Sequence, residues 1–251
     1  MALQEEFEQQ GLWLFRYRSV LPIIILLIGA ALYLRTEMYP ETFILEGTPY
    51  EIYYEMVSLF IGLIGFSIRV YAVGHTPKNT SGRNTAEQLA DTLNTTGIYS
   101  IVRHPLYLGN FLMWLAPALW TGNFWFIVAF VLFYWVYYER IMFAEEQFLR
   151  KKFGEDYINW ANKTPAFLPN LKHYTKAAYP FSWKKVLKKE KNGLAALFLI
   201  FAVLNVSGEM VEKGVAHYNY FIIIGCCVTM ILYFVLKYIK KHTNLLNEEN
   251  R

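Results

Sequence analysis

Cysteine is almost absent from the sequence. The only two cysteines, Cys226 and Cys227, are adjacent within an apolar stretch. Neighbouring cysteines in one helix lack the geometry for a useful disulfide, and a metal cage needs further ligands around them. We therefore expect neither a disulfide framework nor a metal site, and we interpret both cysteines as packing residues.

Charged residues are also scarce. They make up 18% of the 251 residues, whereas hydrophobic residues make up 55%. This composition excludes an ordinary soluble domain, in which about a quarter of the residues are charged. The net charge of +4 then favours contact with anionic lipid, and we expect no nucleic-acid partner.

Long charge-free runs indicate where the chain crosses a membrane. They extend over Ser19–Leu34, Met56–Ile68, Pro105–Tyr138, Gly193–Gly208 and Gly214–Leu236. A transmembrane helix needs about 20 mostly apolar residues, so the last run suffices alone and the shorter runs need flanking residues. The third run contains a turn signal at residues 121–123, which predicts two antiparallel helices. The sequence therefore predicts an all-α integral membrane protein with about six transmembrane helices.

The sequence lacks both a signal-peptide cleavage site and a common nucleotide-binding motif. No small-residue cleavage site follows the first apolar run, so we expect this run to be retained as a helix. The sequence also lacks a GxGxxG-type loop and a βαβ pattern, which excludes a nucleotide-binding fold of that kind. Any cofactor pocket must then be built from helix ends and loops.

Loop charge predicts the orientation. Residues 35–55 carry five glutamates and one arginine, whereas residues 139–191 carry twelve lysines and arginines. The positive-inside rule places the second segment in the cytoplasm. We expect residues 75–104 and both termini on that same side, with residues 1–18 forming an interfacial helix.

One polar stretch stands directly before the longest apolar run. Residues 96–110 read TGIYSIVRHPLYLGN, in which Arg103 and His104 precede Pro105. Proline is favoured in the first turn of a helix, so the two cationic side chains are predicted at a helix mouth, where backbone N–H groups attract anions. A histidine that only caps the helix is the alternative.

A second group of polar residues follows this run. Helical spacing of apolar residues predicts one helix over Glu139–Ala161, with Glu145 and Glu146 at the border of its apolar stripe. A surface pair between Glu146 and Arg150, which would stabilise the helix by only ~0.2–0.5 kcal/mol, is the alternative.

Upstream, Arg69 lies inside the second apolar segment. An arginine there marks a functional site unless its long side chain reaches back to the interface. The loop that follows is expected to hold a short helix over Thr85–Leu93.

Residues 96–110 resemble the GxYxxVRHPxYxG signature of membrane-embedded methyltransferases. This family includes the isoprenylcysteine carboxyl and phospholipid N-methyltransferases. Residues 145–169, EEQFLRKKFGEDYINWANKTPAFLP, resemble the second element of that family. Two elements in the right order are more specific than one short motif. The resemblance implies an S-adenosylmethionine-dependent methyltransferase with a lipid substrate.

The resemblance also implies roles for single residues. Arg103 and His104 would be catalytic, and Arg69, Arg103 and Arg140 would bind the substrate. Many bacterial relatives carry a basic residue shortly before the paired glutamates, where this chain has Ile141–Ala144. We expect Arg140, one helical turn earlier, to take the place of that residue. The cofactor would be bound by Tyr99, His104, Tyr107, Leu108, Gly109, Glu145 and Glu146, with no metal.

The sequence of residues 141–169 most resembles a bacterial branch of the family that methylates the 1-phosphate of lipid A. The resemblance therefore implies this phosphate as the methyl acceptor, in a bacterial inner membrane. A phosphate oxygen is already anionic and needs no general base. A carboxylate on a prenylated lipid and a phosphatidylethanolamine amine are alternative acceptors. An NADPH-dependent membrane reductase and a non-catalytic membrane adaptor are alternatives of another class.

These observations divide the chain into three segments. Residues 1–75 hold the interfacial helix and two transmembrane helices. Residues 76–170 form the methyltransferase core. Residues 171–251 contain a basic linker and two C-terminal transmembrane helices.

Overall fold

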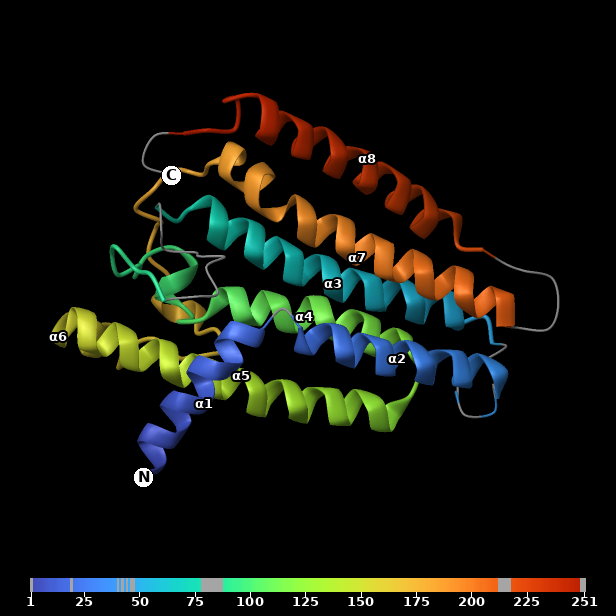
Figure 1. Ribbon diagram of the computed structural model, residues 1–251, viewed down its shortest axis with the longest axis horizontal. Coiled ribbons are helices and arrows are strands. Elements are labelled where there is room, and N and C mark those ends of the chain that lie inside the picture. Colours follow the sequence, from blue (N-terminus) through green and yellow to red (C-terminus); the bar gives the residue numbers. More distant parts are fainter. Residues whose placement is uncertain are drawn as a thin grey trace.

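The computed structural model describes residues 2–18, 20–39, 41, 43, 45, 48–77, 88–211 and 218–248. Within these residues the protein is all α-helical (Figure 1). Its α-helices are α1 Leu3–Tyr17, α2 Leu21–Met38, α3 Glu51–Gly74, α4 Pro105–Trp120, α5 Phe124–Phe153, α6 Glu155–Ala161, α7 Trp183–Val211 and α8 Tyr220–His242. The predicted fold class is confirmed.

Five of these helices, α2, α3, α5, α7 and α8, are long and apolar enough to cross a membrane. The chain is therefore an integral membrane protein. The sixth expected span corresponds to α4, which has 16 residues. At 1.5 Å per residue, α4 extends over roughly 24 Å, less than the roughly 30 Å of a bilayer core.

The long helices lie side by side, with α8 at one edge, then α7, α3 and α4 (Figure 1). Glycines allow α3 and α4 to approach closely. A Cβ atom added at Gly65 would lie 2.6 Å from the Gly109 carbonyl oxygen, so any larger residue would push these two helices apart.

The predicted turn between α4 and α5 is confirmed. Gly122 has a φ of +61°, a backbone conformation that glycine adopts readily. The Asn123 side chain accepts a hydrogen bond of 2.9 Å from the Phe126 backbone N–H, which caps α5. The single apolar run therefore becomes an antiparallel helical pair.

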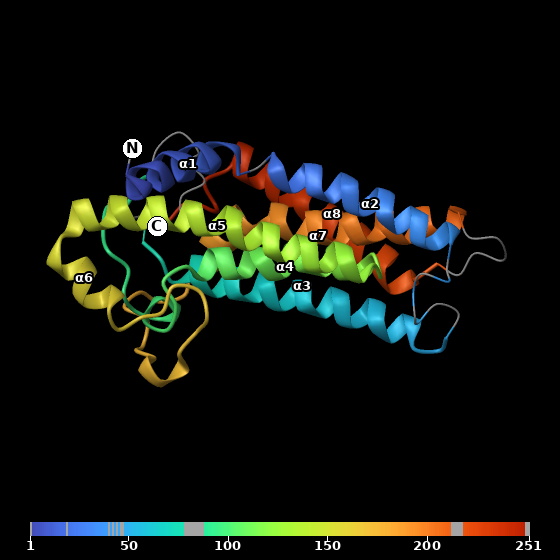
Figure 2. The ribbon, with the colours of Figure 1, turned by 90° about the horizontal axis from the view of Figure 1, so that it is seen from below.

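The prediction of one helix over Glu139–Ala161 is wrong. Gly154 has a φ of +54° and separates α5 from α6. The chain reverses there (Figure 2), and the Trp160 indole N–H donates to the Tyr99 carbonyl oxygen at 3.0 Å. Helical spacing continues across the glycine, so periodicity alone did not reveal the break.

The described parts of the segments that loop charge predicts to be cytoplasmic lie together at one end of the bundle, where the N and C labels also stand (Figures 1 and 2). Backbone hydrogen bonds join residues 97–104 to residues 165–175, including His104 N–H to the Ala166 carbonyl at 3.1 Å. Of the expected helix over Thr85–Leu93, residues 85–87 lie outside the described residues, and residues 88–93 are not helical.

Candidate active site

A cavity of about 530 Å³, called here the main cavity, lies at this end of the bundle. All three segments of the chain contribute to its walls. Its polar and charged lining includes Arg18, Arg69, Gln88, Asn94, Tyr99, Arg103, His104, Tyr107, Asn110, Tyr138, Glu145, Trp160, Lys189 and Glu190.

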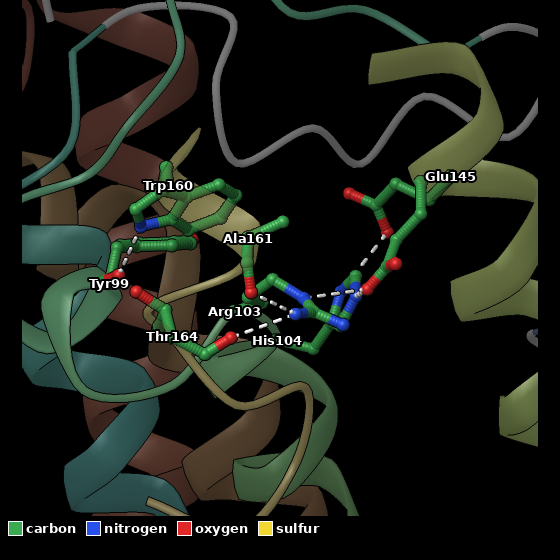
Figure 3. A network of polar contacts seen from close by, with 8 residues as sticks. Tyr99, Arg103, His104, Glu145, Trp160, Ala161 and Thr164 are labelled. Carbon is green, nitrogen blue, oxygen red and sulfur yellow. Dashed lines mark hydrogen bonds and ion pairs between the residues drawn. The ribbon is translucent and has the colours of Figure 1, made fainter. Parts of the chain in front are cut away.

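Arg103 joins three parts of the chain at the wall of the main cavity. Its Nε donates to the Glu146 carboxylate at 2.9 Å. One terminal nitrogen donates to the carbonyl oxygens of Ala161 and Thr164, at 2.7 and 2.8 Å (Figure 3). Hydrogen bonds to charged groups are about twice as strong as neutral ones. Arg103 therefore fixes the start of α4 against α5 and the segment after α6.

His104 and the paired glutamates form one cluster. The buried His104 ring has its Nε2 2.9 Å from a Glu146 carboxylate oxygen and its Nδ1 3.8 Å from Glu145 (Figure 3). The Tyr107 hydroxyl donates to the same Glu145 oxygen at 2.7 Å. Glu145 lines the main cavity, whereas Glu146 lies outside its lining. Glu146 thus contacts Arg103 and His104 outside the main cavity.

Two tyrosines outside the membrane-spanning helices remain protonated in this cluster. Burial raises the pKa of the Tyr99 hydroxyl, and the nearby Glu145 charge raises it further. Burial and the Glu146 charge likewise raise the pKa of Tyr157. Tyr99 therefore presents a neutral hydroxyl to the main cavity.

Arg69 does not simply extend to the interface. It forms a bidentate ion pair with Glu190 of α7, with nitrogen–oxygen distances of 2.9 and 2.8 Å. It also donates to the Asn110 side chain at 2.6 Å. Because the Glu190 side chain is only 3% exposed, this pair joins α3, α4 and α7 at the cavity wall.

Four predicted site residues lie outside the lining of the main cavity: Glu146, as described above, and Leu108, Gly109 and Arg140. Gly109 faces α3, and a Cβ atom there would lie 2.6 Å from the Arg69 Cγ, so its small size is explained by helix packing. Leu108 packs against an apolar cluster that contains Tyr134. The Arg140 guanidinium lies 3.5 Å from the centre of the Phe7 ring of α1.

The sequence prediction missed several lining residues, among them Arg18, Asn110, Lys189 and Glu190. Asn110 ends the motif stretch, so its position gave a usable signal. Arg18 stands among interface residues, and Lys189 and Glu190 stand in a lysine-rich segment. Such residues usually face solvent or lipid head groups, so nothing local marked them as cavity residues.

Fold and site together define a class: an integral membrane protein with a charged cavity built from helix ends and loops. Residues 56–156 match the family model of phospholipid methyltransferase. This segment contains the first motif and both glutamates.

Individual relatives agree with this match. The chain is 36% identical over 77 residues to a protein-S-isoprenylcysteine O-methyltransferase of Schizosaccharomyces pombe, covering 31% of this chain and 33% of that protein. It is 32% identical over 116 residues to the cobalt-zinc-cadmium resistance protein CzcN of Cupriavidus metallidurans, covering 46% and 51%. A protein-S-isoprenylcysteine O-methyltransferase of Tribolium castaneum is 25% identical over 139 residues, covering 55% and 50%. No solved structure gives a significant match.

These matches show that the central segment of the chain is similar to phospholipid and protein-S-isoprenylcysteine methyltransferases. The resemblance predicted from the two motifs is confirmed for this segment. The chain spans only about a third to a half of the length of these relatives. The comparisons give no support to the lipid A branch and favour the isoprenylcysteine alternative.

Proposed function

We propose that this protein transfers a methyl group from S-adenosylmethionine to an anionic oxygen of a lipid-anchored acceptor. The observation that carries the proposal is the cluster of His104, Tyr107 and Glu145 at the wall of the main cavity, within the family-matched residues. The proposal assigns the central segment, residues 76–170, as the catalytic core, to which the two flanking segments add cavity walls.

The donor set fits the cofactor. S-adenosylmethionine supplies an electrophilic methyl group on a sulfonium and also carries an ammonium, a carboxylate and an adenine ring. The Glu145 side chain is 34% exposed and offers a carboxylate to the positively charged groups. The His104 and Tyr107 rings, stacked with centroids 5.5 Å apart, offer aromatic surface. Glu146 orients His104 and Arg103 from behind.

The chemistry requires positioning more than proton transfer. An acceptor oxygen forms a bond to the methyl carbon while the carbon–sulfur bond breaks and its electron pair stays on sulfur. An acceptor that is already ionised loses no proton, so alignment and exclusion of water account for most of the rate. A reaction that depends on alignment fits a site whose side chains are fixed in place. Here His104 is held by Glu146 at 2.9 Å, and Tyr99 stays neutral.

For the acceptor we propose the carboxylate of a lipid-anchored cysteine. Two of the relatives reported above are named as O-methyltransferases of protein-S-isoprenylcysteine. The lipid A 1-phosphate predicted from the sequence is also an anionic oxygen, but none of these relatives is named for it. A phosphatidylethanolamine amine would first have to lose a proton.

We propose the cytoplasmic face for the site. The end of the bundle that holds the main cavity also holds the basic segment 139–191, with twelve lysines and arginines. The positive-inside rule assigns such segments to the cytoplasm. A lipid-anchored acceptor would reach the main cavity from the inner leaflet.

Cofactor binding is tested by isothermal titration on the detergent-purified protein. We expect a heat signal from S-adenosylmethionine and none from NADPH. Glu145→Gln should weaken binding about 10-fold or more, because a charge-assisted contact contributes ~1.5–3 kcal/mol. Glu155→Gln, which changes an exposed carboxylate of α6, should bind like wild type. Binding of NADPH alone would overturn the proposal.

The acceptor is tested by mass spectrometry with S-adenosylmethionine that carries a deuterated methyl group. Prenylated cysteine, lipid A and phosphatidylethanolamine are offered separately in mixed micelles. We expect label on the prenylated cysteine. Label on lipid A only would restore the lipid A assignment, and label on the amine only would refute an anionic oxygen acceptor.

A further inference from the structure

Among the cationic side chains that line the main cavity, Arg69 and Arg103 are each held by a carboxylate. Arg69 is paired with Glu190 at 2.8 Å, and Arg103 is paired with Glu146 at 2.9 Å. Arg103 also donates to two backbone carbonyl oxygens. These bonds hold α3, α4, α5 and α7 together, so both arginines act mainly in building the cavity walls.

Arg18 differs in its placement. It stands where α1 ends and α2 begins, and its guanidinium carbon lies 4.0 Å from the centre of the Phe15 ring. Phe15, Arg18 and Pro22 together line the main cavity. A stacked guanidinium keeps its N–H groups in its own plane, so stacking on Phe15 is compatible with donation to an anion.

The position of Arg18 brings its charge close to the proposed chemistry. Arg18 lines the main cavity together with Tyr107 and Tyr138. The Tyr107 hydroxyl is in turn hydrogen-bonded to Glu145. Arg18 therefore acts on the same region as the proposed cofactor cluster, from the side of α1 and α2.

We propose that Arg18 binds the anionic head group of the acceptor. This inference rests on the proposed function and adds an acceptor-binding residue from outside the family-matched residues 56–156. A carboxylate or phosphate has more than one oxygen, so one oxygen accepts from the guanidinium while another faces the methyl group. A neutral amine offers no such second atom.

The expected position of Arg18 relative to the membrane surface fits the binding of a head group. The junction of an amphipathic helix with a membrane span lies at the level of lipid head groups, where arginine is favoured. The ring of Phe15 and the side chain of Pro22 give apolar surface beside the charge, against which the first carbons of an anchored chain can lie. A lipid-anchored acid presents its charge and its chain in this same arrangement.

The test compares Arg18→Ala and Arg18→Lys with Arg16→Ala, which removes an exposed arginine of the same helix. With prenylated cysteine as acceptor, we expect Arg18→Ala to raise KM about 10-fold or more and Arg18→Lys to raise it less. The Kd of S-adenosylmethionine should stay unchanged in all three variants, and Arg16→Ala should keep the wild-type KM.

A second readout separates head-group binding from a structural role. Prenylated cysteine and its carboxamide are compared as ligands that compete with the acceptor. Wild type should prefer the acid, and Arg18→Ala should lose this preference. An unchanged preference, or an unchanged KM, in a variant that still binds S-adenosylmethionine would overturn the role of Arg18 alone. Failure of wild type to bind S-adenosylmethionine would overturn the proposed function instead.

Discussion

At the residue scale, Arg103 shows how one side chain joins separate parts of the chain. Its charge was predicted to face the acceptor, and the structure adds hydrogen bonds to Glu146, Ala161 and Thr164. The planar guanidinium reaches these three acceptors from fixed directions, which a lysine ammonium on a flexible stem does not reproduce. Its contribution to stability therefore depends on shape as well as charge.

We predict that Arg103→Lys lowers the free energy of unfolding by about 2 kcal/mol, because hydrogen bonds from charged groups contribute ~1.5–3 kcal/mol. Thermal unfolding in detergent measures the change. Arg150→Lys, at an exposed position of the same α5, should unfold like wild type. If both variants unfold alike, the bonds of Arg103 have no net effect on stability.

At the element scale, α7 completes a site whose core belongs to other helices. Its Glu190 is buried and holds Arg69 of α3, while Lys189 adds a cation to the cavity lining. Neither residue belongs to the family-matched segment. The structure therefore shows that α7, from the C-terminal segment, forms part of the cavity wall.

We predict that Glu190→Gln destabilises the protein by about 3–5 kcal/mol, because removing one partner leaves the other charge buried without compensation. Thermal unfolding measures this effect as well. Replacing both partners, Arg69→Met with Glu190→Met, should recover much of the stability, since apolar side chains of similar size can replace a buried ion pair. A single variant as stable as wild type would contradict the role of this pair.

At the scale of the whole molecule, the two ends of the bundle differ in charge. The end that holds the main cavity is basic, and the opposite connection, residues 35–55, carries five glutamates. This difference predicts one orientation in the membrane. In that orientation, the main cavity would lie on the side where lipid head groups of the inner leaflet are accessible.

Single-cysteine labelling in intact cells measures the orientation, in a background that lacks Cys226 and Cys227. We expect an impermeant reagent to label cysteine introduced at Tyr50, which is exposed at the acidic end. Cysteine introduced at Lys172, which is exposed at the basic end, should react only after permeabilisation. The reverse pattern would move the site to the other face of the membrane.

Much of the architecture could be predicted because its causes are local. Apolar runs of sufficient length determined the spans, and Gly122 with Asn123 determined the turn between α4 and α5. Two short motifs indicated His104, Tyr107 and Glu145, which the structure brings together. Each of these features depends on residues close to one another in the sequence.

The tertiary structure alone decided how charges pair and where the chain reverses. Arg69 is 121 positions from Glu190. Glu146 pairs with Arg103 and His104, and not with Arg150 of its own helix, which the sequence offered as the alternative partner. Gly154 broke a helix whose apolar spacing continued unchanged. Sequence patterns report which face of a helix is apolar, but which faces meet depends on the packing of the whole bundle. For that reason the walls of the cavity, and Arg18 among them, became evident only in the fold.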